Sequence, residues 1–148
     1  MPGEVGESQR PQPLKARVLL AEDNVVNQAV ARGMLQRLGC EVVVAANGRE
    51  AIAAVGRGRF DFILMDCQMP ELDGFEATRL LRHLESSGPA GTHSTPIIAL
   101  TANAMEGDRE RCLAAGMDDY LAKPVKQAQL ADVIAKWRRA DTKLEAVA

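Results

Sequence analysis

Four apolar residues run directly into a carboxylate in the stretch Phe62-Ile63-Leu64-Met65-Asp66, and the turn-rich segment Cys67-Gln68-Met69-Pro70-Glu71-Leu72-Asp73-Gly74 follows. A short apolar run bounded by turn residues is typical of a buried strand, so we expect the Asp66 carboxylate at the mouth of that strand. A second site has the same build, because Val18-Leu19-Leu20-Ala21 runs straight into Glu22-Asp23. Two strands that both end in carboxylates predict one acidic pocket.

The rest of the chain alternates short apolar segments with amphipathic ones. Strands are predicted over 17–22, 41–45, 60–65, 96–100 and 118–122. All but the last are apolar runs rich in Val, Ile or Leu, which suits strands buried on both faces of a parallel sheet. Because right-handed crossovers join parallel strands, the pattern predicts an α/β fold. We expect a doubly wound (βα)5 three-layer sandwich whose five-stranded parallel sheet has the order 2-1-3-4-5, as in flavodoxin-like folds.

Apolar spacing and capping residues define the helices between the strands. The first helix carries an apolar stripe at a spacing of four, Val26, Val30, Met34 and Leu38. The third, 74–86, is expected to bury Phe75, Leu81 and Leu84, and the last, 126–139, presents Leu130, Val133, Ile134 and Trp137. The fourth is expected over 105–115. The predicted cap residues are Asn24 and Gly39 for the first helix, Asn47 with Glu50 for the second, and Gly116 for the fourth.

Length and charge narrow the function classes. The chain has 148 residues, enough for one domain with a core. We expect that domain over 16–139, with 1–15 a disordered linker or tail and 140–148 a short tail. The net charge of -2 provides no basic field for direct contact with nucleic acid or with a membrane. No apolar run nears the roughly 20 residues that span a bilayer, and the first residues lack the order of a signal peptide.

The cysteines and histidines offer little chemistry of their own in the sequence. Cys40, Cys67 and Cys112 are widely spaced and form no zinc-binding pattern, which fits a reducing compartment. Cys67 is either a nucleophile or a small buried filler, and the lack of a nearby histidine in the sequence favours the filler. His83 and His93 are expected on the solvated surface.

Side chains at the predicted strand ends form the candidate site. Parallel strands share one carboxyl edge, where ligands bind beside the point at which the strand order reverses. That edge collects Glu22, Asp23, Asp66, Thr101 and Lys123. Clustered carboxylate oxygens favour Mg²⁺ or Mn²⁺, although strand-end acids also cap helices or sit in water. Likewise, the Lys is a salt-bridge partner or a phosphate ligand, and the Thr is a helix cap or a hydrogen-bond donor to a phosphoryl oxygen.

Taken together, these side chains suit phosphoryl transfer. A cation neutralises charge, Lys123 and Thr101 hold the phosphoryl oxygens, and a carboxylate attacks phosphorus. Asp66 is the best nucleophile, because it lies centrally between the other acids and the two donors. The sequence therefore predicts a covalent aspartyl-phosphate.

Four segments resemble the receiver domain of two-component response regulators. They are Val18 to Asn24, Ile63 to Gly74, Ile97 to Ala102, and Tyr120 to Pro124, within a match over about residues 15–138. The resemblance implies that Asp66 is the phosphoacceptor, which takes a phosphoryl group from a phosphohistidine. It also implies that Asp23 and Asp66 bind Mg²⁺ with the main-chain carbonyl of Gln68, and that Glu22 reaches the metal through water.

The same resemblance assigns the remaining site residues. Lys123 is similar to the phosphate-pairing lysine of the family, Thr101 to the switch hydroxyl, and Tyr120 to the aromatic residue that turns inward when the hydroxyl moves. The alternative for Tyr120 is an amphipathic edge residue with a wet hydroxyl, but its position and spacing favour the switch.

The run Glu22 to Gln28, with Ala102 to Met105 and Ala115 to Tyr120, resembles receivers of hybrid sensor histidine kinases. This implies a histidine kinase domain or a histidine phosphotransfer protein as partner. It also implies a cytoplasmic location for this domain, whether or not the parent chain is anchored to a membrane. As an isolated domain, this chain would catalyse only its own phosphorylation and dephosphorylation. The alternatives are a free-standing single-domain response regulator, an aspartyl-phosphate phosphatase, in which Gln68 would stand where an acid is needed, and a docking-only pseudo-receiver.

Overall fold

The computed structural model describes residues 16–87, 95–102 and 106–147. The strands are β1 (Arg17–Ala21), β2 (Glu41–Ala45), β3 (Phe62–Asp66), β4 (Ile97–Thr101) and β5 (Asp119–Ala122). The helices are α2 (Val25–Arg37), α3 (Gly48–Arg57), α4 (Gly74–Ser86), α5 (Glu106–Ala115) and α6 (Gln127–Val147). The predicted tail 1–15 and His93 lie outside the described residues. None of the helices in the described part of the chain combines the length and apolarity needed to cross a membrane.

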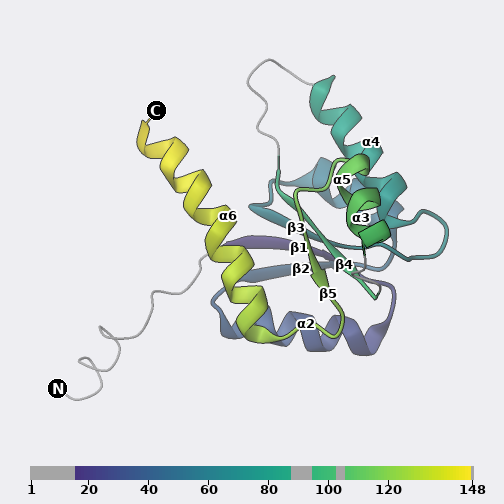
Figure 1. The fold of residues 1–148 in the computed structure, drawn as a ribbon, viewed down its shortest axis with the longest axis horizontal. Coiled ribbons are helices and arrows are strands. Elements are labelled where there is room, and N and C mark those ends of the chain that lie inside the picture. Colours follow the sequence, from purple (N-terminus) through teal and green to yellow (C-terminus); the bar gives the residue numbers. More distant parts are fainter. Residues whose placement is uncertain (1–15, 88–94, 103–105, 148) are drawn as a thin grey trace.

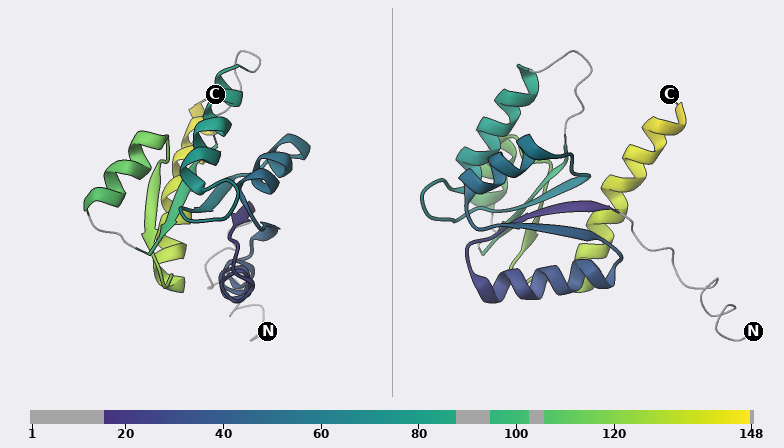
Figure 2. Two further views of the ribbon diagram at one scale, coloured as in Figure 1. Left: turned by 90° about the vertical axis from the view of Figure 1, so that its right-hand side faces the viewer. Right: turned by 180° about the vertical axis from the view of Figure 1, so that it is seen from behind.

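The five strands form one parallel sheet in the order β2-β1-β3-β4-β5, which confirms the predicted fold. Successive side chains of a strand point to opposite faces, so Ile63 and Met65 of β3 pack under α3, α4 and α5. Phe62 and Leu64 of the same strand pack under α2 and α6. Figures 1 and 2 show the sheet between α2 on one side and α3 and α4 on the other. The sheet therefore has a core on each face, as a three-layer sandwich requires.

Caps fix the helix starts beside the carboxyl edge of the sheet. The side chain of Asn24 accepts from the amide of Asn27 at 3.0 Å, and Asp73 accepts from the amide of Glu76 at 2.9 Å. Asn47 accepts from Glu50 in the same way at 2.9 Å. At the other ends, Gly39 and Gly116 have φ values of 91° and 107°, a conformation that glycine adopts without a steric penalty. The predicted positions Asn24, Asn47, Gly39 and Gly116 are confirmed.

The predicted apolar stripe of α2 does not face the core along its whole length. Val26 and Val30 are 69% and 51% exposed, whereas Met34 and Leu38 pack against the core around the buried Leu35. The reason is geometric. An α-helix turns about 100° per residue, so positions four apart drift by about 40° at each step. The stripe therefore winds around the helix, and only its second half reaches the sheet.

Two further helix predictions differ from the structure. Leu84 was expected in the core but is 54% exposed, because it lies in the last turn of α4, beyond the buried Phe75 and Leu81. The last helix runs to Val147 instead of ending near 139, and Figure 1 shows it continuing past the sheet. Its predicted contact face is confirmed, since Leu130 and Ile134 are fully buried.

A single arginine joins three elements at the amino edge of the sheet. From α4, Arg82 donates to the carbonyls of Gly116 at 2.9 Å and Thr95 at 2.8 Å. Its guanidinium also pairs with Asp118 at 2.6 Å, and that carboxylate accepts from the amide of Ile97 at 2.8 Å. Arg82 is therefore a planar clamp between α4, the start of β4 and the start of β5.

The clamp predicts a stability difference between two arginines of α4. Arg82→Met should lower the free energy of unfolding by about 2–3 kcal/mol, because a partly buried carboxylate and two carbonyls lose their donor. Arg79→Met is the matched control, since Arg79 is 53% exposed beside an equally exposed Glu76 and should change stability by less than about 0.5 kcal/mol. Urea unfolding measures both values. Equal effects of the two substitutions would contradict the clamp.

Candidate functional site

Two buried carboxylates share one ammonium group at the carboxyl edge of the sheet. Glu22 follows β1 and is 2% exposed, and Asp66 ends β3 and is 4% exposed. Lys123, which follows β5, places its Nζ 2.8 Å from Asp66 Oδ2 and 3.0 Å from Glu22 Oε1. Two buried negative charges without a nearby cation are strongly unfavourable, and the Lys123 ammonium offsets them.

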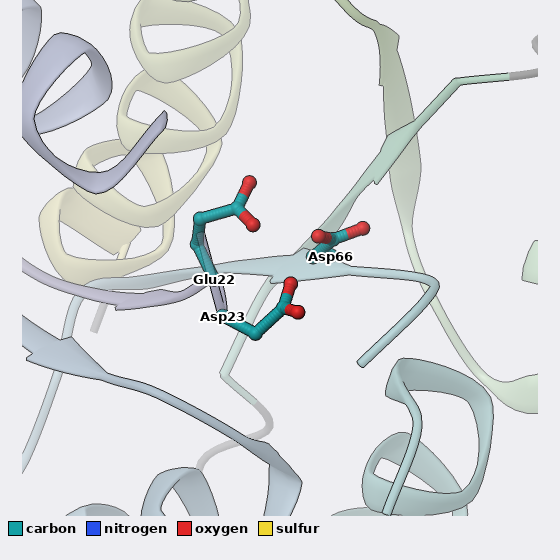
Figure 3. Close-up of side chains that lie close together, drawn as sticks. All are labelled: Glu22, Asp23 and Asp66. Atoms are coloured by element: carbon teal, nitrogen blue, oxygen red, sulfur yellow. The ribbon is translucent and has the colours of Figure 1, made fainter. Parts of the chain in front are cut away.

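A third carboxylate completes an acidic cluster. One oxygen each of Glu22, Asp23 and Asp66 lies within 4.8 Å of the others, and Figure 3 shows the three side chains gathered at the ends of β1 and β3. Asp23 is exposed, so the cluster opens to solvent on that side. An all-oxygen donor set of this kind fits a hard divalent cation such as Mg²⁺. The predicted acidic pocket is therefore present in the fold.

The pocket is a cleft of about 230 Å³ at this edge of the sheet. It is lined by Glu22, Asp23, Asn24, Asn27, Asp66, Cys67, Gln68, Ala102 and Lys123. Asn27 and Ala102 were not predicted as lining residues. Gln28 was also missed, and its side-chain Nε2 donates to the main-chain carbonyl of Glu22 at 2.6 Å. Only the helical period from the Asn24 cap, which returns to the same side three to four residues later, could have indicated Asn27 and Gln28.

Backbone hydrogen bonds hold Asp66 and Glu22 in place. The amide of Gln68 donates to Asp66 Oδ1 at 3.1 Å, and the amide of Asn24 donates to Glu22 Oε2 at 3.1 Å. Behind Asp66, the amide of Gly74 donates to the carbonyl of Cys67 at 3.2 Å. A Cβ atom at position 74 would collide with the Asp66 carbonyl, so this close approach needs glycine. The turn after β3 thus fixes the carboxylate in the cleft.

The two predicted switch residues lie on the face of the sheet that α5 covers. Thr101 ends β4 and is buried, and its carbonyl accepts from the amide of Lys123 at 2.8 Å. Tyr120 pairs with Ala99 in the β4–β5 ladder, and both belong to the core cluster on this face. Thr101 is two residues beyond Ala99 and so points to the same side. The half-buried Tyr120 ring has the guanidinium of Arg109 5.8 Å from its centre.

The environment of Lys123 favours its charged form. Burial alone would lower the pKa of this ammonium. The hydrogen bonds to Asp66 and Glu22 and the negative charge of both carboxylates outweigh burial, so the pKa of Lys123 lies above its ordinary value of 10.5. Lys123 therefore stays a cation throughout the neutral range.

Residues 18–135 match the family model of the response regulator receiver domain. The chain belongs to this family. Receiver domains are the phosphoacceptor domains of two-component phosphorelays, which confirms the function predicted from the strand-end residues.

Several relatives are hybrid histidine kinases, as the sequence predicted. The chain is 47% identical over 120 residues to hybrid signal transduction histidine kinase B of Dictyostelium discoideum; this covers 77% of the chain but only 6% of that kinase. Among solved structures, the receiver domain of sensor histidine kinase PA1611 from Pseudomonas aeruginosa is 50% identical, with a TM-score of 0.74 over 83% of this chain and 97% of that one. Its cleft coordinates a magnesium ion.

A second solved structure shows a receiver with a partner. The receiver domain of Saccharomyces cerevisiae Ssk1 is 36% identical to this chain, with a TM-score of 0.77 over 83% of this chain and 88% of that one. That receiver was crystallised with the histidine phosphotransfer protein Ypd1. The family thus includes receivers that bind phosphotransfer proteins.

The raised pKa of Lys123 predicts a stability loss at high pH. A group whose pKa is raised by folding stabilises the protein fully below its unfolded value and loses that contribution as pH rises through the folded value. Lys123→Met should therefore cost about 1–3 kcal/mol at neutral pH, and its difference from the wild type should shrink above pH 10.5. Urea unfolding between neutral pH and about pH 11.5 measures this difference.

Lys136→Met is the control for that experiment. Lys136 is 67% exposed beside Asp119, so its loss should change stability by less than about 0.5 kcal/mol. A Lys123→Met variant as stable as the wild type at neutral pH would show that the ammonium does not stabilise the buried carboxylates.

Proposed function

We propose that Asp66 is the phosphoacceptor of a two-component phosphorelay and that Lys123 and Thr101 assist the transfer. The observation that supports this proposal most strongly is the 2.8 Å contact between the Lys123 ammonium and the Asp66 carboxylate inside an open acidic cleft. One Asp66 oxygen attacks the phosphorus of a phosphohistidine, the P–N bond breaks, and the imidazole leaves with that electron pair. Lys123 then pairs with a phosphoryl oxygen, to which the Thr101 hydroxyl also donates.

Magnesium is the proposed cofactor of this step. Bound Mg²⁺ supplies the positive charge that lets an anionic nucleophile approach an anionic phosphoryl group. Asp23 and Asp66 would hold it directly with the main-chain carbonyl of Gln68, and Glu22 would reach it through water. The all-oxygen cluster of this chain and the magnesium in the PA1611 cleft support the assignment, with Mn²⁺ as the hard-cation alternative.

The phosphoryl group would change the surface formed by α5, β5 and α6. Thr101 moves toward the new charge and Tyr120 follows, because both side chains lie on the α5 face of the sheet. Only a small energy gap between the two packings is needed for phosphorylation to shift the population. Phosphorylation would therefore act by changing which partner proteins bind to the surface formed by α5, β5 and α6.

The proposed phosphodonor is a histidine kinase domain or a histidine phosphotransfer protein. Three valines in the first turns of α2, Val25, Val26 and Val30, are 74%, 69% and 51% exposed. Val25 follows directly on Asn24, which lines the cleft. An exposed apolar patch beside a reactive group fits a protein donor that must bring its phosphohistidine to Asp66. The Ssk1–Ypd1 complex supports this donor class.

The relatives support an origin in a hybrid sensor histidine kinase. The chain would then act as the receiver module of a longer kinase and, on its own, would catalyse only its own phosphorylation and dephosphorylation. A free-standing single-domain response regulator is the alternative, and the same site chemistry serves both.

Phosphoryl uptake should depend on Asp66 and not on the carboxylate at the opposite end of the same strand. Asp66→Asn should take up no phosphoryl group from acetyl phosphate with Mg²⁺, because an amide oxygen is too weak a nucleophile. Asp61→Asn should behave like the wild type, since Asp61 precedes β3, away from the cleft, where it accepts from the Arg17 amide at 2.7 Å. Intact-mass spectrometry reads both. Full phosphorylation of the Asp66→Asn variant would reject the assignment.

The valine patch predicts a separation between protein and small-molecule donors. Val26→Asp should slow phosphotransfer from a histidine phosphotransfer protein about tenfold, because docking would bury an unpaired charge. It should leave uptake from acetyl phosphate unchanged. Leu84→Asp is the control, since Leu84 is 54% exposed on the far end of α4. Equal rates for Val26→Asp and the control would place the docking surface elsewhere.

A further inference from the structure

Two thiols lie against each other directly behind the phosphoacceptor position. Cys67 Sγ and Cys112 Sγ are 3.8 Å apart, although the residues are 45 positions apart in sequence. Cys67 is 3% exposed at the end of β3, and Cys112 is 1% exposed on α5. Both are reduced and belong to the core cluster under α3, α4 and α5. Cys40 lies in the other cluster, on the opposite face of the sheet.

We propose that Cys67 and Cys112 form an oxidisable dithiol that closes to an intramolecular disulfide when the protein meets a small peroxide. A disulfide needs the two sulfurs about 2.05 Å apart, so they must approach by less than the width of one atom. The backbone of Cys67 is held on both sides, by its amide to Leu100 at 3.0 Å and by Gly74 to its carbonyl at 3.2 Å. The approach therefore comes from side-chain rotation and from α5.

The oxidant has a route to Cys67. Cys67 lines the acidic cleft and also a second cleft of about 540 Å³ between the turn after β3 and α5. The wall of the second cleft includes Phe75 and Arg111, whose guanidinium lies 4.4 Å from the centre of the Phe75 ring. A peroxide the size of hydrogen peroxide fits there, whereas a bulky oxidant does not reach thiols that are this buried.

The chemistry balances with hydrogen peroxide as the only co-reactant. One thiol attacks a peroxide oxygen, the O–O bond breaks, and a sulfenic acid and one water form. The second thiol attacks that sulfur, the S–S bond forms, and the hydroxyl leaves as a second water. The two thiols lose two electrons and two protons in total, and the peroxide is reduced to water.

The location gives the disulfide a consequence, which rests on the proposed function. The bond would tie the residue after Asp66 to α5, on the same face of the sheet as Thr101 and Tyr120. Phosphorylation requires movement on this face, and a covalent link between its fixed strand and its outer helix restrains that movement. The oxidised protein should accept a phosphoryl group from acetyl phosphate at least about fivefold more slowly than the reduced protein.

Thiol counting tests the site without reference to phosphorylation. The full chain is treated with hydrogen peroxide, unfolded, alkylated and weighed, and its peptides are mapped. The reduced wild type should carry three labels, one for each cysteine. The oxidised wild type should carry one label, on Cys40, with a peptide that links Cys67 to Cys112. Cys67→Ala and Cys112→Ala should each keep two labels after the same treatment, and Cys40→Ala should keep none.

Three retained labels in the oxidised wild type would overturn the proposal. So would a disulfide that includes Cys40 or joins two chains, or sulfonic acid at either position in place of the bond. Each Cys→Ala substitution removes only one sulfur atom from the core. Cys40→Ala keeps both Cys67 and Cys112, so it still tests the disulfide if another variant fails to fold.

The rate comparison then tests the consequence. Reduced wild type and Cys112→Ala should be phosphorylated at similar rates, and peroxide should slow only the wild type, with recovery after dithiothreitol. A disulfide that forms without slowing phosphoryl uptake would overturn the proposed effect on phosphorylation, but the oxidisable dithiol itself would stand. A reduced wild type that takes up no phosphoryl group would instead reject the proposed function, and the thiol count would still decide the dithiol.

Discussion

The contact of one ammonium with two buried carboxylates is the constraint around which this domain is organised. Lys123 lies within 3.0 Å of both Asp66 and Glu22, which come from different strands and are almost fully buried. Neither acid could be kept there without a nearby cation. The parallel order of the sheet, the glycine packed against the Asp66 backbone and the turn after β5 all serve to bring these three charges together.

The same contact links stability to function. The ion pair lies in an open cleft beside the exposed Asp23. In the proposed phosphorelay, its lysine would exchange a carboxylate partner for a phosphoryl oxygen. The side chains that would respond, Thr101 and Tyr120, come from β4 and β5 of the same sheet and lie on the face that α5 covers, so the proposed chemistry and its readout share one end of the sheet.

The sequence predicted what depends on strand order, and missed what depends on helix rotation or distant pairing. Five parallel strands necessarily bring residues such as Asp66 and Lys123 to one edge, so the site was predictable. The exposure of Val26 was not, because a spacing of four winds around a helix and the sequence does not show which part faces the sheet. Arg82 and the Cys67–Cys112 pair make contacts far along the chain that no local pattern encodes.

The most direct test is to locate the phosphoryl group chemically. The chain is phosphorylated with acetyl phosphate and Mg²⁺, the acyl phosphate is reduced with borohydride, and the peptides are sequenced by mass spectrometry. The account predicts homoserine at position 66 and at no other aspartate, with no conversion when Mg²⁺ is removed by a chelator. Homoserine at another acidic position such as Asp23, or none at all in a folded, magnesium-loaded protein, would contradict it.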